Sequence, residues 1–288
     1  MTTSNSIHTK HSAFKQSQTE WRKAYDAEYR SKRKLAKNKL VEKYKAGLAK
    51  LVKKEKYDKS HTLGFGAFRI NRSGEYSRLP PEFGPILKAC EEFIDNPRRF
   101  PALHACGGTA INNRQCRVLI AKVLAVILPR TDLIGGRIGE TTKANFNPIS
   151  YDYLQEDFVL RWGKAISPSS FDKAIKYLRV AGYITIEQIK VGVDEVNGIV
   201  RSGAAYKQFT EAFFSDLKVV RYENIVKMIL ETRARYENMG YSFKWAHFRT
   251  IAKKVKEIFN TYGLEKMAFE TKELFLRQGA LAPHASPH

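Results

Sequence analysis

The chain has 288 residues, with 50 Lys and Arg against 29 Asp and Glu, so its formal net charge is +21. An apolar fraction of 43%, including 17 Phe and 14 Tyr, is ordinary for a globular protein and excludes a wholly disordered chain. No apolar run is long enough to span a membrane and the N-terminus has no apolar signal region, so we expect a cytoplasmic protein without a membrane partner.

The excess of positive charge opposes compaction through self-repulsion, and a polyanionic partner would relieve it. About half of the charge lies in the first 60 residues, an asymmetry typical of nucleic-acid-binding arms. A charged surface that serves only solubility is the other reading. The three cysteines lack the paired spacing of a metal site, so we expect free thiols, no metal and no cofactor.

Residues 1–60 are predicted to form a disordered polar tail and one long basic helix. From Thr19 to Lys59 there is no Pro, one Gly and only a thin apolar stripe. We assign DNA contact to the basic cluster Arg30, Lys32, Arg33 and Lys34. The other readings of this helix are a solvated element on the rim of the domain and a surface for a protein partner.

The next part of the chain, 61–148, is predicted to contain a linker or small hairpin followed by two helices. A short strand is expected at 67–70, and helices are expected at about 81–94 and 112–128, with prolines limiting their ends. The Gly-rich segment 131–148 lacks the spacing of a dinucleotide-binding loop, and we expect it to be an exposed loop.

Residues 149–214 show the pattern of a winged helix. A short helix over 151–158 is followed by a turn and a second, amphipathic helix over 168–181, which Ser167 caps and Pro168 begins. Alternating residues and the turn signal Asn197-Gly198 then predict a two-stranded wing over about 183–210. The other reading is a helix–hairpin packing unit with no role in DNA binding.

The second helix of such a unit fits the major groove of DNA, with its first residues near the base edges. Its capped start can also hold a phosphate on free backbone N–H groups. We assign DNA contact to residues of this helix, its cap and the wing: Ser167, Ser169, Ser170, Lys173, Lys176, Arg179, Lys190 and Arg201.

A C-terminal helical region is predicted over 215–279, before a tail at 280–288. One helix is expected over 220–239, a second from Ser242 and a third over 264–278. The second helix directs apolar residues inward and five cations outward, which either hold phosphates or form a solvated face: Lys244, Arg249, Lys253, Lys254 and Lys256. We therefore expect a mainly α protein with a helical and winged-helix core over 61–214.

Short motifs in this core resemble the RepA-type replication initiators of FII-group theta-replicating plasmids. They are Gly163-Lys164-Ala165-Ile166-Ser167, Ala174-Ile175-Lys176-Tyr177-Leu178 and Ala181-Gly182-Tyr183-Ile184-Thr185, with Pro97-Arg98-Arg99-Phe100 upstream. The resemblance covers about residues 85–260 and leaves out the basic N-terminal helix. It implies a bacterial protein that binds a plasmid origin as several copies and recruits host replication initiator and helicase proteins.

No enzyme motif is found in the sequence. The seven His residues include no His-apolar-His pair of a rolling-circle initiator, and Gly163-Lys164 is followed by Ala165, unlike a phosphate-binding loop. Asp152, Glu156 and Asp157 do not share one helix face, as the metal ligands of a nuclease would. We therefore expect no catalytic activity. The alternatives to an initiator are a winged-helix transcription regulator, a sequence-independent nucleic-acid-binding protein and a structural partner-binding protein.

Overall fold

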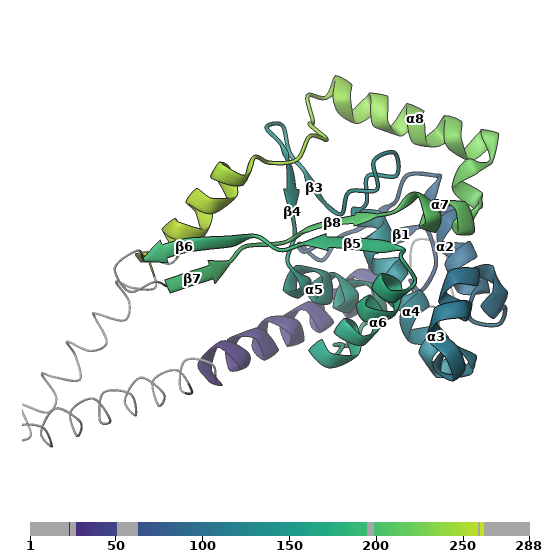
Figure 1. Ribbon diagram of the computed structural model, residues 1–288, viewed down its shortest axis with the longest axis horizontal. Coiled ribbons are helices and arrows are strands. Elements are labelled where there is room, and N and C mark those ends of the chain that lie inside the picture. The colour runs from purple at the N-terminus through teal and green to yellow at the C-terminus, as the bar shows by residue number, and fades with distance from the viewer. Residues whose placement is uncertain (1–22, 24–26, 51–62, 195–198, 259, 262–288) are drawn as a thin grey trace, which may run out of the picture. The chain divides into compact units, whose positions relative to one another are not determined.

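The computed structural model describes residues 23, 27–50, 63–194, 199–258 and 260–261 (Figure 1). The described chain is mainly helical, as expected, with short strands in two-stranded sheets. Two compact units interleave along the chain. The first comprises Met1–Arg99, Gly108–Pro129 and Asp152–Lys176, and the second comprises Phe100–Gly107, Arg130–Tyr151 and Tyr177–His288. In the described part, no helix is long and apolar enough to cross a bilayer.

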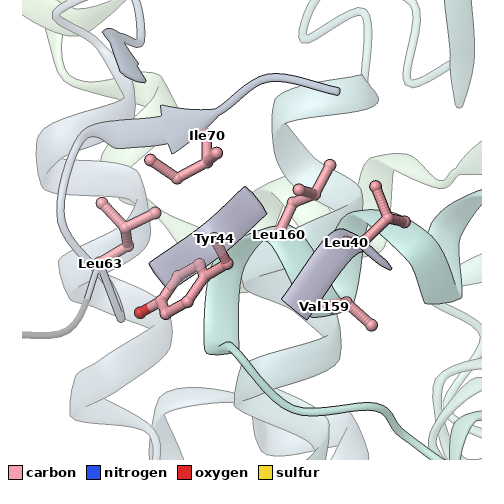
Figure 2. Close-up of a cluster of buried hydrophobic side chains, with 6 residues drawn as sticks. All are labelled: Leu40, Tyr44, Leu63, Ile70, Val159 and Leu160. Atoms are coloured by element: carbon pink, nitrogen blue, oxygen red, sulfur yellow. The ribbon is translucent and has the colours of Figure 1, made fainter. Parts of the chain in front are cut away.

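The predicted N-terminal helix is present over 27–50 and belongs to the core of the first unit. Its Leu40 and Tyr44 are buried, and Figure 2 shows them among apolar side chains from later segments: Leu63, Ile70, Val159 and Leu160. Gly47 lies so close to Ile70 that an added Cβ would come within 2.8 Å of its side chain. The helix is therefore packed along its C-terminal half, whereas Leu35 of the predicted stripe is 58% exposed.

The rest of the first unit follows the predicted order of elements. Strand β1 (Phe68–Ile70) pairs with β2 (Tyr76–Arg78), which confirms the short strand and the hairpin reading. Helices α2 (Phe83–Glu92) and α4 (Arg114–Ile127) confirm the two predicted helices, with short 3₁₀ turns η1 (Pro97–Arg99) and η2 (Leu128–Arg130) after them. Further along the chain, this unit contains nearly all of α5 (Tyr151–Trp162) and the start of α6 (Pro168–Val180).

Helix α3 (Pro101–Asn112) was not expected from the sequence. Its helical residues are interrupted at Gly108, whose φ of 51° is open to glycine and costly for other residues. The two consecutive glycines, Gly107 and Gly108, lower the helix propensity of this segment.

The second unit contains the remaining sheets. β3 (Gly139–Thr141) pairs with β4 (Phe146–Pro148), and β5 (Ile184–Glu187) pairs with β8 (Tyr206–Phe209). β6 (Lys190–Asp194) pairs with β7 (Ile199–Ser202), and the last four strands run as one long hairpin, here called the ribbon (Figure 1). The predicted two-stranded hairpin is thereby confirmed, and its turn signal Asn197-Gly198 lies outside the described residues.

The prediction of an exposed loop at 131–148 was wrong. Thr131, Asp132, Ile138 and Phe146 are buried, and the segment pairs with β8: the Ile138 N–H donates to the Lys207 carbonyl over 2.9 Å. Gly136 has a φ of 71°, and a Cβ there would collide with the carbonyl of Phe209. Gly136, one of the glycines that indicated an exposed loop, instead lies where two backbones approach closely.

The second unit ends in helices α7 (Glu211–Leu217) and α8 (Glu223–Asn238), separated by η3 (Val219–Arg221). Helix α8 confirms the helix predicted at 220–239. The helix expected from Ser242 begins instead at 248, because residues 242–245 extend along the β3–β4 hairpin through bridges to Thr142 and Phe146. The third predicted helix, at 264–278, lies outside the described residues.

Candidate nucleic-acid interface

Helix α6 begins with the cap that the sequence predicts. The Ser170 N–H donates to the Ser167 hydroxyl oxygen over 3.1 Å, and the Phe171 N–H donates to the Ser167 carbonyl over 3.0 Å. The Ser167 hydroxyl in turn donates to Ser170 Oγ over 2.8 Å. Pro168 follows the cap, where its missing N–H leaves no helical hydrogen bond unmade. Ser167 and Ser170, two of the three serines assigned to DNA contact, therefore also hold the start of the helix.

The two faces of α6 differ sharply in chemistry. Phe171, Ala174, Ile175 and Leu178 are buried, which confirms the predicted apolar stripe. The opposite face is exposed and polar: Ser169, Asp172, Lys173, Lys176 and Arg179. Within the described residues, none of its three cations forms an ion pair. The cations are three positions apart, so they follow one side of the helix over about 9 Å.

The end of α6 leads directly into the ribbon. Gly182 has a φ of 71°, and the Tyr183 N–H donates back to the Leu178 carbonyl over 2.9 Å. This is the usual glycine termination of a helix. Residue 184 then starts β5, so only three residues separate the helix from the first strand of the ribbon.

The register of the ribbon separates the two cations assigned to the wing. Lys190 lies opposite Ser202, and Val191 lies opposite Arg201. Because directly opposed residues of an antiparallel pair share a face, Arg201 lies on the face of Val191, and Lys190 lies on the other. Lys190 and Arg201, both assigned to DNA contact, therefore lie on opposite faces of the ribbon.

One face of the ribbon is covered by the helix at 248–258. Ile189 and Val191 are buried with Ala246 and Ile251, and a Cβ added to Gly203 would lie 3.2 Å from Ile251. The other face is open, with Lys190, Gly192, Val200 and Ser202 all exposed. The strands β6 and β7 and this helix are called the arm from here on.

The arm carries most of the outward cations predicted in the C-terminal region. Arg249, Lys253, Lys254 and Lys256 are exposed on the helix at 248–258, and Lys244 is exposed before it. Lys253 and Glu257 are 4.0 Å apart, at the limit of an ion pair between two exposed side chains. Ala246, Ile251 and Val255 face the ribbon as predicted, whereas Ile258 is 57% exposed.

The four cations of the basic cluster on the N-terminal helix differ in exposure and in ion pairing. Arg30 and Lys34 are exposed, and Lys32 is exposed in a 2.7 Å pair with Glu28. The guanidinium of Arg33 pairs with Asp152 of α5 and is only 19% exposed. Arg33 therefore holds the helix against α5, and the assignment of Arg33 to DNA contact is not supported by its position.

The carboxylates of α5 are all matched by arginines of the first unit. Asp152 pairs with Arg33, and Glu156 and Asp157 both pair with Arg72. The guanidinium of Arg72 also lies 3.8 Å from the ring centroid of Tyr153. Among the described residues, these arginines neutralise carboxylates, whereas the three cations of α6 do not.

Sequence reasoning missed Lys207, a buried cation of β8. Its ammonium donates to the carbonyl of Ile149 and, over 3.1 Å, to the carbonyl of Ala205. It also lies 4.9 Å from the ring centroid of Tyr151. Burial lowers the pKa of Lys207 to about 8. The alternation of β8 was the available signal, because Lys207 occupies the same face of the strand as the buried Phe209.

Among the described residues, no group of three or more His, Cys, Asp or Glu is arranged to hold a metal ion. No protein-family model, curated protein or solved structure matches the chain. A function must therefore be inferred from the chemistry of α6, the arm and the sequence motifs.

Proposed function

We propose that this chain binds double-stranded DNA through a winged-helix unit in which α6 enters the major groove. The observation that carries the proposal is the exposed face of α6, where Lys173, Lys176 and Arg179 have no ion-pair partner in the described chain. In the first unit, by contrast, Arg33 and Arg72 are each paired with carboxylates of α5. A polyanion would supply the missing counter-charge along α6.

The side chains on this face suit base edges as well as phosphates. Lysine and arginine donate to the O6 and N7 acceptors of guanine, and serine can contact either bases or phosphates. The exposed Asp172 beside Lys173 is repelled by phosphates but can accept a hydrogen bond from the amino group of cytosine. A carboxylate in a basic row therefore favours sequence-specific reading by α6 over purely electrostatic binding.

The arm and the N-terminal helix would add contacts that do not depend on sequence. Lys190 and the cations at 249–256 are exposed on different sides of the arm, and Arg30 and Lys34 are exposed on the N-terminal helix. Contacts of this kind hold phosphates and position a protein on the duplex. Their number also favours a second candidate function, sequence-independent binding of nucleic acid.

The motif resemblance extends the proposal to plasmid replication. In this function, several copies bind the origin next to the gene and recruit the host replication initiator and helicase proteins. The alternative within the same chemistry is a transcription regulator that binds a promoter. A plasmid that carries only this gene and its flanking DNA should replicate if the chain is an initiator and should be lost if it is a regulator.

The DNA-binding proposal is tested by comparing fragments that flank the gene with random DNA at about 150 mM salt. Selection should enrich one fragment, and the double variant Lys173→Glu, Lys176→Glu should bind it roughly a hundredfold more weakly. Its affinity for random DNA should fall much less, because the arm cations remain.

The matched control is Lys88→Glu, Lys143→Glu, which reverses two exposed lysines on other elements and changes the net charge equally. The control should retain specific binding. If the two double variants lose equal affinity, or if the α6 variant loses the same factor on specific and random DNA, α6 does not read the sequence.

A further inference from the structure

Helix α8 has an apolar row on its exposed side. Tyr222 and Leu230 are each 54% exposed and Val226 is 37% exposed, whereas Ile225 and Ile229 are buried on the side that packs in the second unit. Val226 and Leu230 are four positions apart on the helix and form one row, and Tyr222, the extended residue that caps the start of α8, precedes them. Val226 and Leu230 extend the apolar face of α8 beyond the part buried in the second unit, and this extension can be buried only against another molecule or segment.

A row of charges runs beside this apolar row. Glu223, Lys227, Glu231 and Arg235 are exposed, again four positions apart, and their signs alternate along the helix. In the described part of the chain, none of the four forms an ion pair. From residue 223 to residue 235 the signs are negative, positive, negative, positive, and in the opposite direction they are positive, negative, positive, negative. It is therefore complementary to itself in the antiparallel direction.

We infer that α8 pairs with the α8 helix of a second copy of this chain in an antiparallel, two-fold symmetric dimer. In this arrangement Glu223 faces Arg235 of the partner subunit, and Lys227 faces Glu231 of the partner subunit. Val226 packs beside Leu230 of the partner subunit, and each contact occurs twice because of the symmetry. A parallel pair would instead set each charge against its own like charge.

The charge row is what selects a second copy over other occupants of the apolar row. An unrelated partner requires no particular order of charges on α8, whereas a two-fold dimer requires a row that matches its own reverse. Coverage by residues 262–288 of the same chain would leave the protein monomeric at every concentration, and this outcome is distinguished below.

The test is sedimentation velocity of the full chain without DNA, from about 1 to 100 μM. The wild-type chain should shift from monomer to dimer across this range. Leu230→Glu should remain monomeric, because it places a charge in the apolar row, yet should keep its thermal unfolding midpoint, since Leu230 is exposed.

Two charge reversals give the decisive comparison. Lys227→Glu and Glu231→Lys should each weaken self-association by at least about tenfold, because each sets like charges against one another at two places in the dimer. An equimolar mixture of the two variants should dimerise, since every facing pair at positions 227 and 231 then contains one Glu and one Lys. If each substitution weakened dimerisation only by altering its own helix, mixing the two variants would not restore the dimer.

Lys143→Glu is the matched control for Lys227→Glu, because it makes the same change of net charge at an exposed position between β3 and β4. It should dimerise as the wild type does. The inference is overturned by a wild-type chain that is monomeric throughout, by a dimer that tolerates Leu230→Glu, or by a mixture of the two reversed variants that stays monomeric. None of these results bears on DNA binding by α6.

Discussion

Arg161 and Lys207 are buried cations that are held by carbonyl oxygens. Arg161 donates to the carbonyls of Gly64 and Phe68 over 2.9 and 3.0 Å, and burial lowers its pKa to about 10. Lys207 makes equivalent contacts to Ile149 and Ala205 in the second unit. Carbonyl dipoles satisfy the donors but only partly replace the hydration of a full charge, which is why both pKa values fall. These residues join segments distant in the chain and are structural.

Lys207 should make stability depend on alkaline pH. Its pKa falls from 10.5 to about 8 on folding, so between these values the unfolded chain binds more protons than the folded chain. The free energy of unfolding should therefore rise with pH through this window and be independent of Lys207 titration below it. Relative to Lys207→Met, the wild type should gain about 2 kcal/mol between pH 7 and pH 10 in urea unfolding. A difference that stays constant with pH would show that the ammonium is solvated.

At the scale of elements, the N-terminal helix has one side that packs in the first unit and another that exposes cations. Its Leu40 and Tyr44 are core residues, and Arg33 is bound to Asp152, so the helix is part of the first unit. Arg30 and Lys34 remain exposed on it. Deleting the whole helix would therefore damage folding as well as any DNA contact, and single substitutions are needed to separate the two.

Substitutions on the two sides of this helix should have separable effects. Leu40→Ala should lower the free energy of unfolding by about 2–4 kcal/mol, because it leaves a cavity in the cluster. Arg30→Glu with Lys34→Glu should change stability by less than about 0.5 kcal/mol and weaken binding to every DNA sequence. Chemical unfolding and the salt dependence of binding measure the two effects. Unchanged affinity for random DNA would remove the N-terminal helix from the interface.

At the scale of the whole molecule, a dimer formed through α8 and DNA binding by α6 together predict the symmetry of the DNA site. A two-fold dimer presents two copies of α6 related by the same axis, and such proteins bind half-sites that are inverted repeats. The inference about α8 and the proposal about α6 are tested separately above, so either can fail without the other.

The enriched fragment should accordingly contain two inverted half-sites that are protected together. In nuclease footprinting, the wild type should protect both half-sites over one narrow concentration range, because the dimer contacts bind the two copies together. Leu230→Glu should protect each half-site independently and at higher concentration, while Lys143→Glu should behave as the wild type. Direct repeats, or equal cooperativity in the two variants, would contradict a two-fold arrangement on DNA.

The sequence by itself determined those features of the protein that depend on near neighbours. The Ser167-Pro168 start of α6, its apolar stripe, the glycine end and the alternating strands of the ribbon all follow from residues within a few positions of one another. The exposed cations of α6 follow from the same helical period. For this reason, the order of helix, helix and hairpin could be predicted without coordinates.

Only the tertiary structure decided which residues meet across long separations. It paired Arg33 with Asp152, set Lys190 and Arg201 on opposite faces of the ribbon, and placed Gly136 against the backbone of β8. Composition describes Arg33 and Arg30 alike, although among the described residues Arg33 has a carboxylate beside it and Arg30 does not. The contacts that distinguish them join positions more than a hundred residues apart, where neither helical period nor strand alternation carries information.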